Sequence, residues 1–172
     1  MSLPKRIEIT EVGPRDGWQN HKAMIIPTEV KAKYVKKMID AGADKIEVTS
    51  FVNPKAVPQM ANAKDLVALV QPYAKEKGCQ TIGLALNKRG VDDAVAAGVD
   101  YVGFGISVSE EHNKRNSNRK KINFDVCGLS FKHFVLFFAV VFASAYLGFM
   151  PTVTIYSNSA GAFTATTFVG SV

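Results

Sequence analysis

Charge is what the end of this sequence lacks. The chain has 172 residues, with 21 Lys and Arg against 15 Asp and Glu, a formal net charge of +6. All but two of these side chains, Asp125 and Lys132, lie within residues 1–121, and none lies within residues 133–172. Soluble domains carry about a quarter charged residues, so the composition changes near residues 119–124. We therefore expect a domain at 1–121 and an apolar, charge-free tail at 122–172.

Cysteine is also scarce, which excludes two classes of protein. The chain has only Cys79 and Cys127, in unrelated sequence contexts. Two such cysteines form neither a disulfide framework nor a CxxC metal site, and the reducing cytosol is the expected compartment. The first residues, MSLPKRIEIT, contain no apolar run of the kind found in a secretory signal. We therefore expect a cytoplasmic protein.

Two signatures of nucleotide binding are missing as well. No GxGxxG motif follows the first predicted strand, which argues against a dinucleotide-binding fold. The mostly basic run at 110–121, EEHNKRNSNRKK, has no aromatic side chain that could stack on a base. We expect no nucleic-acid partner. Two interpretations of the run stay open, a solvated loop and a surface that binds phosphates.

Strands and helices alternate through the charged part of the chain. Apolar alternation predicts strands at 6–12, 45–51, 80–86 and 101–107. Helical spacing predicts a helix that opens at 27–29 and stops at Gly42, with Val30, Tyr34, Val35 and Ile39 on its apolar face, and further helices at 62–77 and 91–97. Short connections between such elements predict parallel strands joined by crossover helices.

A weak internal repeat sharpens the fold prediction. AGADKIEV, which starts at Ala41, matches AGVDYVGF, which starts at Ala97, at Ala, Gly and Asp. The offset is 97 − 41 = 56 residues, or two strand–helix units of about 28. Such short, even units favour a barrel over a doubly wound sheet. We predict an α/β protein, the first half of a (β/α)8 TIM barrel, followed by an unrelated apolar tail.

Parallel α/β folds place their sites at the carboxyl ends of the strands, and the first of these ends carries VGPRDGWQN at 12–20, predicted as a loop. Asp16 could bind a hard cation such as Mg²⁺ or Mn²⁺, or could serve as a turn residue or helix cap. Arg15 could bind a carboxylate or carbonyl group, or could form a salt bridge.

The second strand carries Glu47 on the face that would point into a barrel. A carboxylate buried there needs a partner or a chemical role. A functional carboxylate and an ion pair with a Lys or Arg of a neighbouring strand are both open. Further polar clusters follow the third strand, at 87–89, and the fourth, at 107–116.

Four of these segments together resemble hydroxymethylglutaryl-CoA lyases, metal-dependent TIM-barrel enzymes. They are VGPRDGWQN, KIEVTSFVNPKAVPQMA, LALNKRG and FGISVSEEHNKRNSN, and they occur in order within about residues 7–119. The resemblance implies cleavage of 3-hydroxy-3-methylglutaryl-CoA to acetoacetate and acetyl-CoA, a step of leucine degradation and ketone-body formation. It implies an acyl-CoA substrate, a divalent metal (Mg²⁺ or Mn²⁺) and a homodimer.

The resemblance also assigns roles to residues. It implies that Asp16 is a metal ligand, that Arg15 stabilises the enolate oxygen, and that Glu47 is an acid/base or orienting carboxylate. Further residues that it places around the substrate are Gln19, Asn20, Ser50 and Asn87. The later ligands of the family, a His-x-His pair and an Asn, have no counterpart in this sequence, nor does its glycine-flanked catalytic Cys.

The tail leaves several interpretations open. It could be out-of-frame or intron-derived translation joined to a lyase fragment, which is the interpretation we adopt because charge vanishes where the resemblance ends. The uncharged stretch 134–156 is long enough for a membrane span, so a membrane anchor is an alternative to the expected absence of membrane association. An unusual core or aggregation-prone segment is a third. The corresponding alternative to lyase activity is a catalytically inert fragment.

Overall fold

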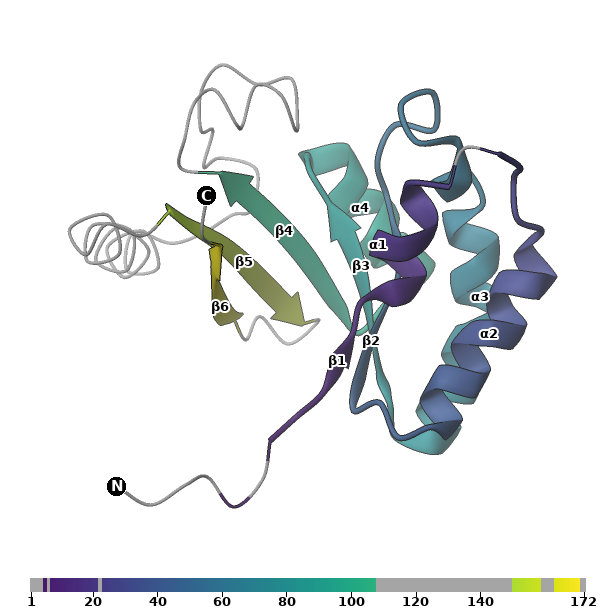
Figure 1. Ribbon diagram of the computed structural model, residues 1–172, viewed down its shortest axis with the longest axis horizontal. Coiled ribbons are helices and arrows are strands. Elements are labelled where there is room, and N and C mark those ends of the chain that lie inside the picture. The colour runs from purple at the N-terminus through teal and green to yellow at the C-terminus, as the bar shows by residue number, and fades with distance from the viewer. Residues whose placement is uncertain (1–4, 6, 22, 108–149, 159–162, 171–172) are drawn as a thin grey trace.

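A single six-stranded sheet organises the protein. The computed structural model describes residues 5, 7–21, 23–107, 150–158 and 163–170. The strands follow one another across the sheet in chain order, from β1 to β6 (Figure 1). Their bounds are β1 Thr10–Glu11, β2 Lys45–Ser50, β3 Gln80–Ala85, β4 Tyr101–Ser107, β5 Met150–Asn158 and β6 Phe163–Gly170.

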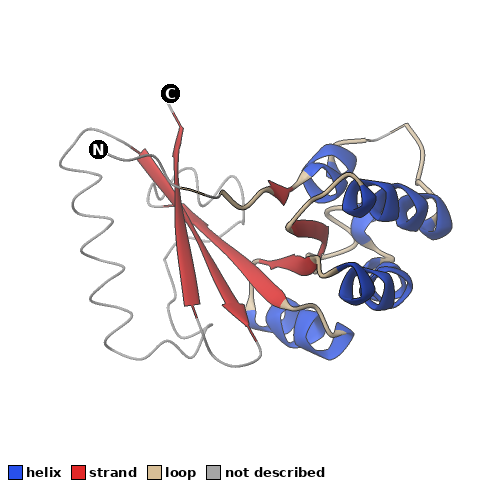
Figure 2. Ribbon diagram, turned by 90° about the horizontal axis from the view of Figure 1, so that it is seen from below, coloured by secondary structure: helices blue, strands red, loops and turns tan. Residues whose placement is uncertain are grey.

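The first four strands are parallel, as the sequence predicts. Each pairs in parallel with the next, for example Glu47 of β2 with Ile82 of β3. The helices between them gather on one side of the strands (Figure 2). Their bounds are α1 Gly13–Gln19, α2 Thr28–Asp40, the 3-10 helix η1 Pro58–Met60, α3 Ala63–Lys77 and α4 Lys88–Ala97. This alternation confirms the α/β class and the first half of a barrel.

The core lies between β2 and the helices that cover it. Ile46 and Val48 of β2 are fully buried against side chains of α2 and α3 such as Val35 and Val67. The large apolar surface removed from water here is what holds the helices on the sheet. The face of α2 is partly mispredicted: Val35 and Ile39 are buried as expected, but Val30 and Tyr34 are exposed.

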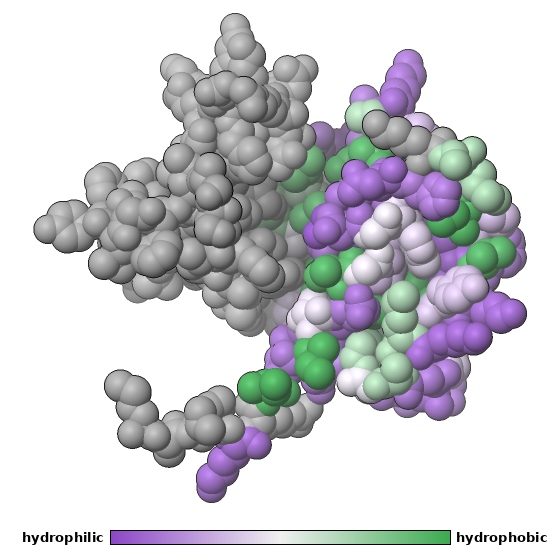
Figure 3. Space-filling view, in the orientation of Figure 1, coloured by the Kyte–Doolittle hydropathy of each residue, from purple (hydrophilic) through white to green (hydrophobic). Residues whose placement is uncertain are grey.

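Strand β1 is much shorter than the predicted span 6–12. It forms the edge of the sheet and has one neighbour, so only Thr10 and Glu11 pair regularly with β2. At Ile9 the carbonyl still accepts from the Lys45 amide at 3.1 Å, but the Ile9 N–H donates to a side chain, Asp44 Oδ2, at 2.9 Å. Ile7 and Ile9 are exposed. On the face shown in Figure 3, hydrophobic residues are scattered among hydrophilic ones rather than joined in one stripe.

The segment predicted as a loop at 12–20 is instead the helix α1. Pro14 stands in its first turn, where its missing N–H costs nothing and its fixed φ suits the helix. The amides of Arg15 and Asp16 both donate to the carbonyl of Val12, at 3.1 and 2.9 Å. Asp16 also lies in the first turn, where a negative charge is favourable to the helix dipole.

The internal repeat has a structural cause that its sequence did not reveal. Asp100 precedes β4 as Asp44 precedes β2, and each accepts a hydrogen bond from a main-chain amide of the preceding strand. Asp44 binds the Ile9 amide, and Asp100 binds the amide of Thr81 at 2.8 Å. Asp100 also accepts from the Thr81 hydroxyl and from Gln71 of α3. The repeated Asp therefore ties neighbouring strands together at their amino ends.

The described part of the tail extends the sheet. β5 pairs antiparallel with β4, and β6 pairs antiparallel with β5. The alternative of a membrane span at 134–156 does not hold for 150–156, which form most of strand β5, and residues 134–149 lie outside the described residues. Within the described part of the chain, no helix is long and apolar enough to cross a membrane.

Candidate active site

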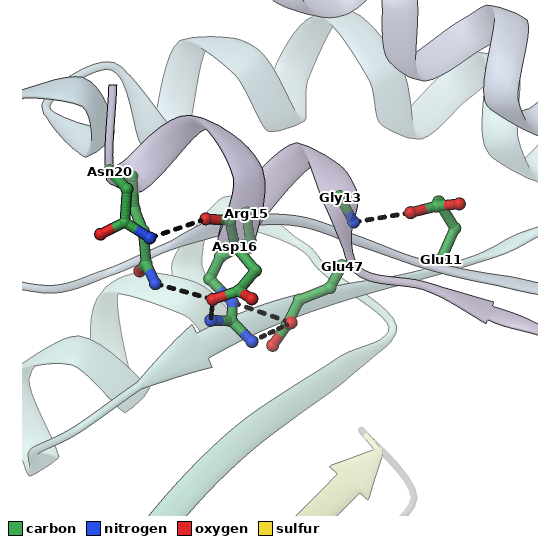
Figure 4. A network of polar contacts seen from close by, with 7 residues as sticks. Glu11, Gly13, Arg15, Asp16, Asn20 and Glu47 are labelled. Carbon is green, nitrogen blue, oxygen red and sulfur yellow. Dashed lines mark hydrogen bonds and ion pairs between the residues drawn. The ribbon is translucent and has the colours of Figure 1, made fainter. Parts of the chain in front are cut away.

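An ion pair joins α1 to the second strand. Arg15 Nε donates to Glu47 Oε2 at 2.9 Å, and Arg15 Nη2 lies 2.7 Å from the same oxygen (Figure 4). The Arg15 side chain is 19% exposed and that of Glu47 only 3%. Both predicted catalytic residues therefore meet. The partner of Glu47 comes from α1, not from a neighbouring strand as the ion-pair interpretation supposed.

The environment of Glu47 acts on its protonation in two opposite directions. Burial raises the pKa of Glu47 above its usual value, because desolvation disfavours the charged carboxylate. The charge of Arg15 and its hydrogen bond oppose that shift. A carboxyl group with a raised pKa can exchange protons nearer neutral pH than an ordinary one. The geometry therefore suits a general acid or base.

Asp16 lies on the outer, solvated side of the same ion-pair network. Its Oδ1 accepts from Arg15 Nη1 and from Gln19 Nε2, each at 2.8 Å. Its side chain is 57% exposed. Among the described residues, none donates a hydrogen bond to its second oxygen, Oδ2. Asn20 donates from its side chain to the main-chain carbonyl of Asp16 at 3.4 Å (Figure 4). Gln19 and Asn20 therefore both contact Asp16.

The remaining predicted site residues, Ser50 and Asn87, have different surroundings. Ser50 is 1% exposed, and its hydroxyl has no partner among the described residues. Buried hydroxyls are nearly always hydrogen-bonded, and this one has its hydrogen-bonding capacity unused among the described residues. Asn87 instead caps α4, since its Oδ1 accepts from the Gly90 amide at 2.8 Å. That helix begins at Lys88, three residues before its predicted start.

A divalent metal would find one ligand of suitable chemistry here. Asp16 offers an exposed carboxylate oxygen, and Mg²⁺ is commonly bound by one or two carboxylates together with water and substrate oxygens. No group of three His, Cys, Asp or Glu lies together in the described ranges. The described residues thus supply one ligand of a metal site, Asp16. The cluster predicted after the fourth strand lies beyond Ser107, outside the described residues.

Sequence reasoning missed a buried polar cluster beside this site. Gln59 of η1 and Lys31 of α2 are 2% and 1% exposed. The Lys31 ammonium donates to the main-chain carbonyl of Gln59 and to Asn62 Oδ1, the latter at 3.1 Å. Burial lowers the pKa of Lys31. A lysine between Val30 and Ala32 gives no sign in the sequence that it is buried; only the apolar neighbours at 32, 35 and 39 could have suggested its face.

The sequence model of the HMGL-like family matches residues 6–125. The mitochondrial hydroxymethylglutaryl-CoA lyase of Rattus norvegicus is 44% identical over 117 residues, which are 68% of this chain and 35% of the rat protein. The chain therefore spans about a third of the length of this relative. The match ends close to where charge leaves the sequence.

Solved structures of lyases share the fold as well. That of the Bacillus subtilis HMG-CoA lyase has a TM-score of 0.62 and 38% identity, over 69% of this chain and 39% of that one. An A. baumannii HMG-CoA lyase, solved in complex with coenzyme A and 3-methylmalate, has a TM-score of 0.61 and 30% identity, over 66% and 36%. The family model matches more than half of the chain and the fold is shared with solved lyase structures, so this chain belongs to the HMGL-like family.

Proposed function

We propose that the Arg15–Asp16–Glu47 network is the amino-terminal part of a lyase site that cleaves 3-hydroxy-3-methylglutaryl-CoA to acetoacetate and acetyl-CoA. One observation carries the proposal: a single guanidinium group contacts a buried carboxylate on one side and an exposed carboxylate on the other. The cleavage creates an anion, the enolate of acetyl-CoA, and needs both positive charge and a proton donor beside it.

Arg15 supplies the positive charge. Its planar group presents five donors, and the contacts with Glu47 and Asp16 fix its plane at the carboxyl end of β2. A preorganised donor of this kind stabilises an oxyanion without having to reorganise when the charge forms. Replacement by a lysine would keep the charge but lose the fork geometry that contacts both carboxylates.

Asp16 is the residue that would hold a divalent metal, Mg²⁺ or Mn²⁺. Such an ion, when bound, supplies a Lewis acid that polarises the oxygens of the substrate. Gln19 keeps one carboxylate oxygen of Asp16 oriented at 2.8 Å. The exposed position of Asp16 leaves room for water, substrate oxygens and further ligands.

Glu47 exchanges the proton. Cleavage takes the proton of the tertiary hydroxyl group, breaks the carbon–carbon bond and returns a proton to the acetyl-CoA enolate. The buried Glu47 carboxyl, with its raised pKa, serves as that acid/base group or orients it. Ser50 offers the substrate a buried hydroxyl that has no partner in the described part of the chain. Gln19, Asn20 and Asn87 complete the polar lining at the ends of the first and third strands.

The test is acetoacetate release from 3-hydroxy-3-methylglutaryl-CoA by the full chain, measured over a range of Mn²⁺ and Mg²⁺ concentrations. We expect metal-dependent release that is lost in Asp16→Ala, because the exposed carboxylate is the only metal ligand proposed on α1. Asp92→Ala is the matched control: it removes an exposed carboxylate that pairs with Lys88 within α4. Absence of release at every metal concentration would refute the activity for this chain.

A catalytically inert chain is the second candidate, and the pairing of β5 favours it. A barrel of this family continues with parallel strands, whereas β5 runs antiparallel to β4 and occupies its free edge. On this candidate the tail at 122–172 is out-of-frame or intron-derived sequence, and the domain ends near residue 121. Acetoacetate release would contradict it. The acyl-CoA partner, the homodimer and the cytoplasmic location remain predictions.

A further inference from the structure

We infer that Gln59 is a positioning residue, which holds α1 over the carboxyl end of β2 independently of the Arg15–Glu47 pair. Its importance for a metal ligand on α1 rests on the function proposed above; its mechanical role does not. The inference starts from the side chain itself. Gln59 is 2% exposed, and its side-chain amide group hydrogen-bonds main-chain groups of His21, Met24 and Ile26, the described partners that it has.

These contacts use the whole hydrogen-bonding capacity on the donor side. Gln59 Nε2 donates to the carbonyls of His21 and Met24, at 3.0 and 2.5 Å. Gln59 Oε1 accepts from the Ile26 amide at 3.2 Å. The described residues of the segment, 21 and 23–26, lie in no helix or strand, so the Gln59 side chain pairs main-chain groups that have no ladder partner.

The segment held in this way follows α1 directly. The His21 amide donates to the carbonyl of Trp18 in α1 at 2.9 Å. His21 is also the residue whose carbonyl accepts from Gln59, so Gln59 binds the residue that closes the last turn of α1. Asp16 lies five residues before His21. A shift of the 21–26 segment would therefore move α1 and the carboxylate on it.

Gln59 can act as an anchor because η1 is fixed at its other contacts. The buried Lys31 ammonium donates to the Gln59 carbonyl and to Asn62, and Asn62 in turn donates to Thr28 at 2.7 Å. On the other side, Met60 accepts from the Thr49 hydroxyl at 3.4 Å. Thr49 lies on β2, beside Ser50 and two residues after Glu47. These contacts, which we call the Gln59 bracket, thus connect α1 through η1 to β2, the strand that carries Glu47.

A second set of contacts that fixes α1, besides the Arg15–Glu47 pair, would help the reaction. When Arg15 turns part of its donor set to a substrate oxygen, its contacts with Glu47 weaken, and the direct link between α1 and β2 weakens with them. The Gln59 bracket contains no group of that ion pair. It keeps α1 in place while Arg15 changes partners, which preserves the preorganisation that such a site needs.

The fluorescence of Trp18, the only tryptophan of the chain, can report whether Gln59 keeps α1 in place. Trp18 lies on α1 and is partly buried against the core. In Gln59→Met, a variant of similar length with no donors, we expect acrylamide quenching of Trp18 fluorescence to rise by about twofold, because α1 opens locally. Gln71→Met is the matched control: Gln71 is also buried, but it binds Thr81 and Asp100 at the amino ends of the strands. It should leave the quenching unchanged.

Hydrogen exchange and metal binding complete the test. In the unaltered chain the Ile26 amide should exchange at least about tenfold more slowly than in an unfolded chain, and Gln59→Met should remove that protection. Gln59→Glu, which keeps an acceptor but loses both donors, replaces Gln59→Met if the latter does not fold. A rapidly exchanging Ile26 amide in the unaltered chain, or unchanged Trp18 quenching in the folded variant, would overturn the inference.

Titration with Mn²⁺ alone separates this inference from the proposed function. We expect Gln59→Met to weaken Mn²⁺ binding roughly tenfold, as loss of an outer supporting contact commonly does, and Gln71→Met to leave it unchanged. If the unaltered chain binds no Mn²⁺, the proposed metal role of Asp16 fails, and the Trp18 and Ile26 readouts still decide the role of Gln59. Unchanged Mn²⁺ affinity in Gln59→Met would contradict a role in positioning Asp16.

Discussion

The two ends of the parallel sheet use aspartate in different ways. At the amino ends, Asp44 and Asp100 accept hydrogen bonds from main-chain amides and tie each strand to the one before it. At the carboxyl end, Asp16 is exposed and leaves one oxygen without a protein donor among the described residues. In barrels of this class, residues at the amino ends serve stability and those at the carboxyl ends serve chemistry. If Asp16 has the proposed metal role, the four parallel strands of this chain follow the same division.

The largest effect should come from removing the cation at the carboxyl end. Arg15→Met leaves a buried Glu47 without its partner, and we expect a loss of about 3 kcal/mol in the free energy of unfolding at pH 8. Because burial raises the pKa of Glu47, the folded state takes up this proton more readily than the unfolded state. The loss should therefore shrink at pH 5, where Glu47 accepts a proton and no longer needs a cation.

Urea denaturation at the two pH values measures this difference. In a Glu47→Gln background there is no buried carboxylate that could lose its cation. Adding Arg15→Met to that background should therefore cause a smaller loss in the free energy of unfolding, with no such pH dependence. An equal loss at pH 5 and pH 8 in the original background would show that Arg15 stabilises by packing rather than through the charge of Glu47.

The next effect concerns the amino ends. Asp100→Ala leaves the Thr81 amide and the side-chain amide of Gln71 short of an acceptor, and we expect a loss of about 2 kcal/mol of stability. Asp44→Ala removes the acceptor of the Ile9 amide at the edge strand and should cost about 1 kcal/mol. Chemical denaturation gives both values. An equal or larger loss for Asp44→Ala would break the ranking.

The smallest effect should appear at Asn87, which the resemblance places around the substrate and which the structure shows as the cap of α4. Asn87→Ala should cost about 1 kcal/mol, whereas Asn87→Ser keeps a capping oxygen and should recover most of it. Thermal melting compares the two variants. If Asn87→Ser restores stability but not acetoacetate release, the side chain has both roles; if it restores both, capping is its whole contribution.

Most of the fold and part of the candidate site could be predicted from hydrophobic periodicity and from the residues at the strand ends. The four parallel strands were predictable because apolar alternation and Gly stops mark each unit, and Glu47 was predictable as a buried carboxylate on a strand buried on both faces. The helix α1 was not predictable from its local pattern. Pro14 and Gly17 resemble a turn, and the packing of Trp18 against the core, which no local pattern shows, adds to the favourable first-turn positions of Pro14 and Asp16.

The buried polar contacts were out of reach for a different reason. Gln59, Lys31 and Asn62 are separated in sequence by up to 31 residues and meet only after α2 and η1 have packed. Their side chains follow no period, since each is set by one main-chain group of another element. The repeated Asp was visible in the sequence. The main-chain amide that it binds was not, because the register between neighbouring strands decides which amide lies opposite the Asp.

The most direct test of a functional carboxyl end is a titration of the full chain with Mn²⁺, followed by electron paramagnetic resonance, in the unaltered protein, Asp16→Ala and Asp100→Ala. The account predicts that Asp16→Ala weakens Mn²⁺ binding at least about tenfold, while Asp100→Ala loses stability and keeps its affinity for Mn²⁺ as long as it remains folded. Equal Mn²⁺ affinity in the unaltered protein and Asp16→Ala would contradict the account.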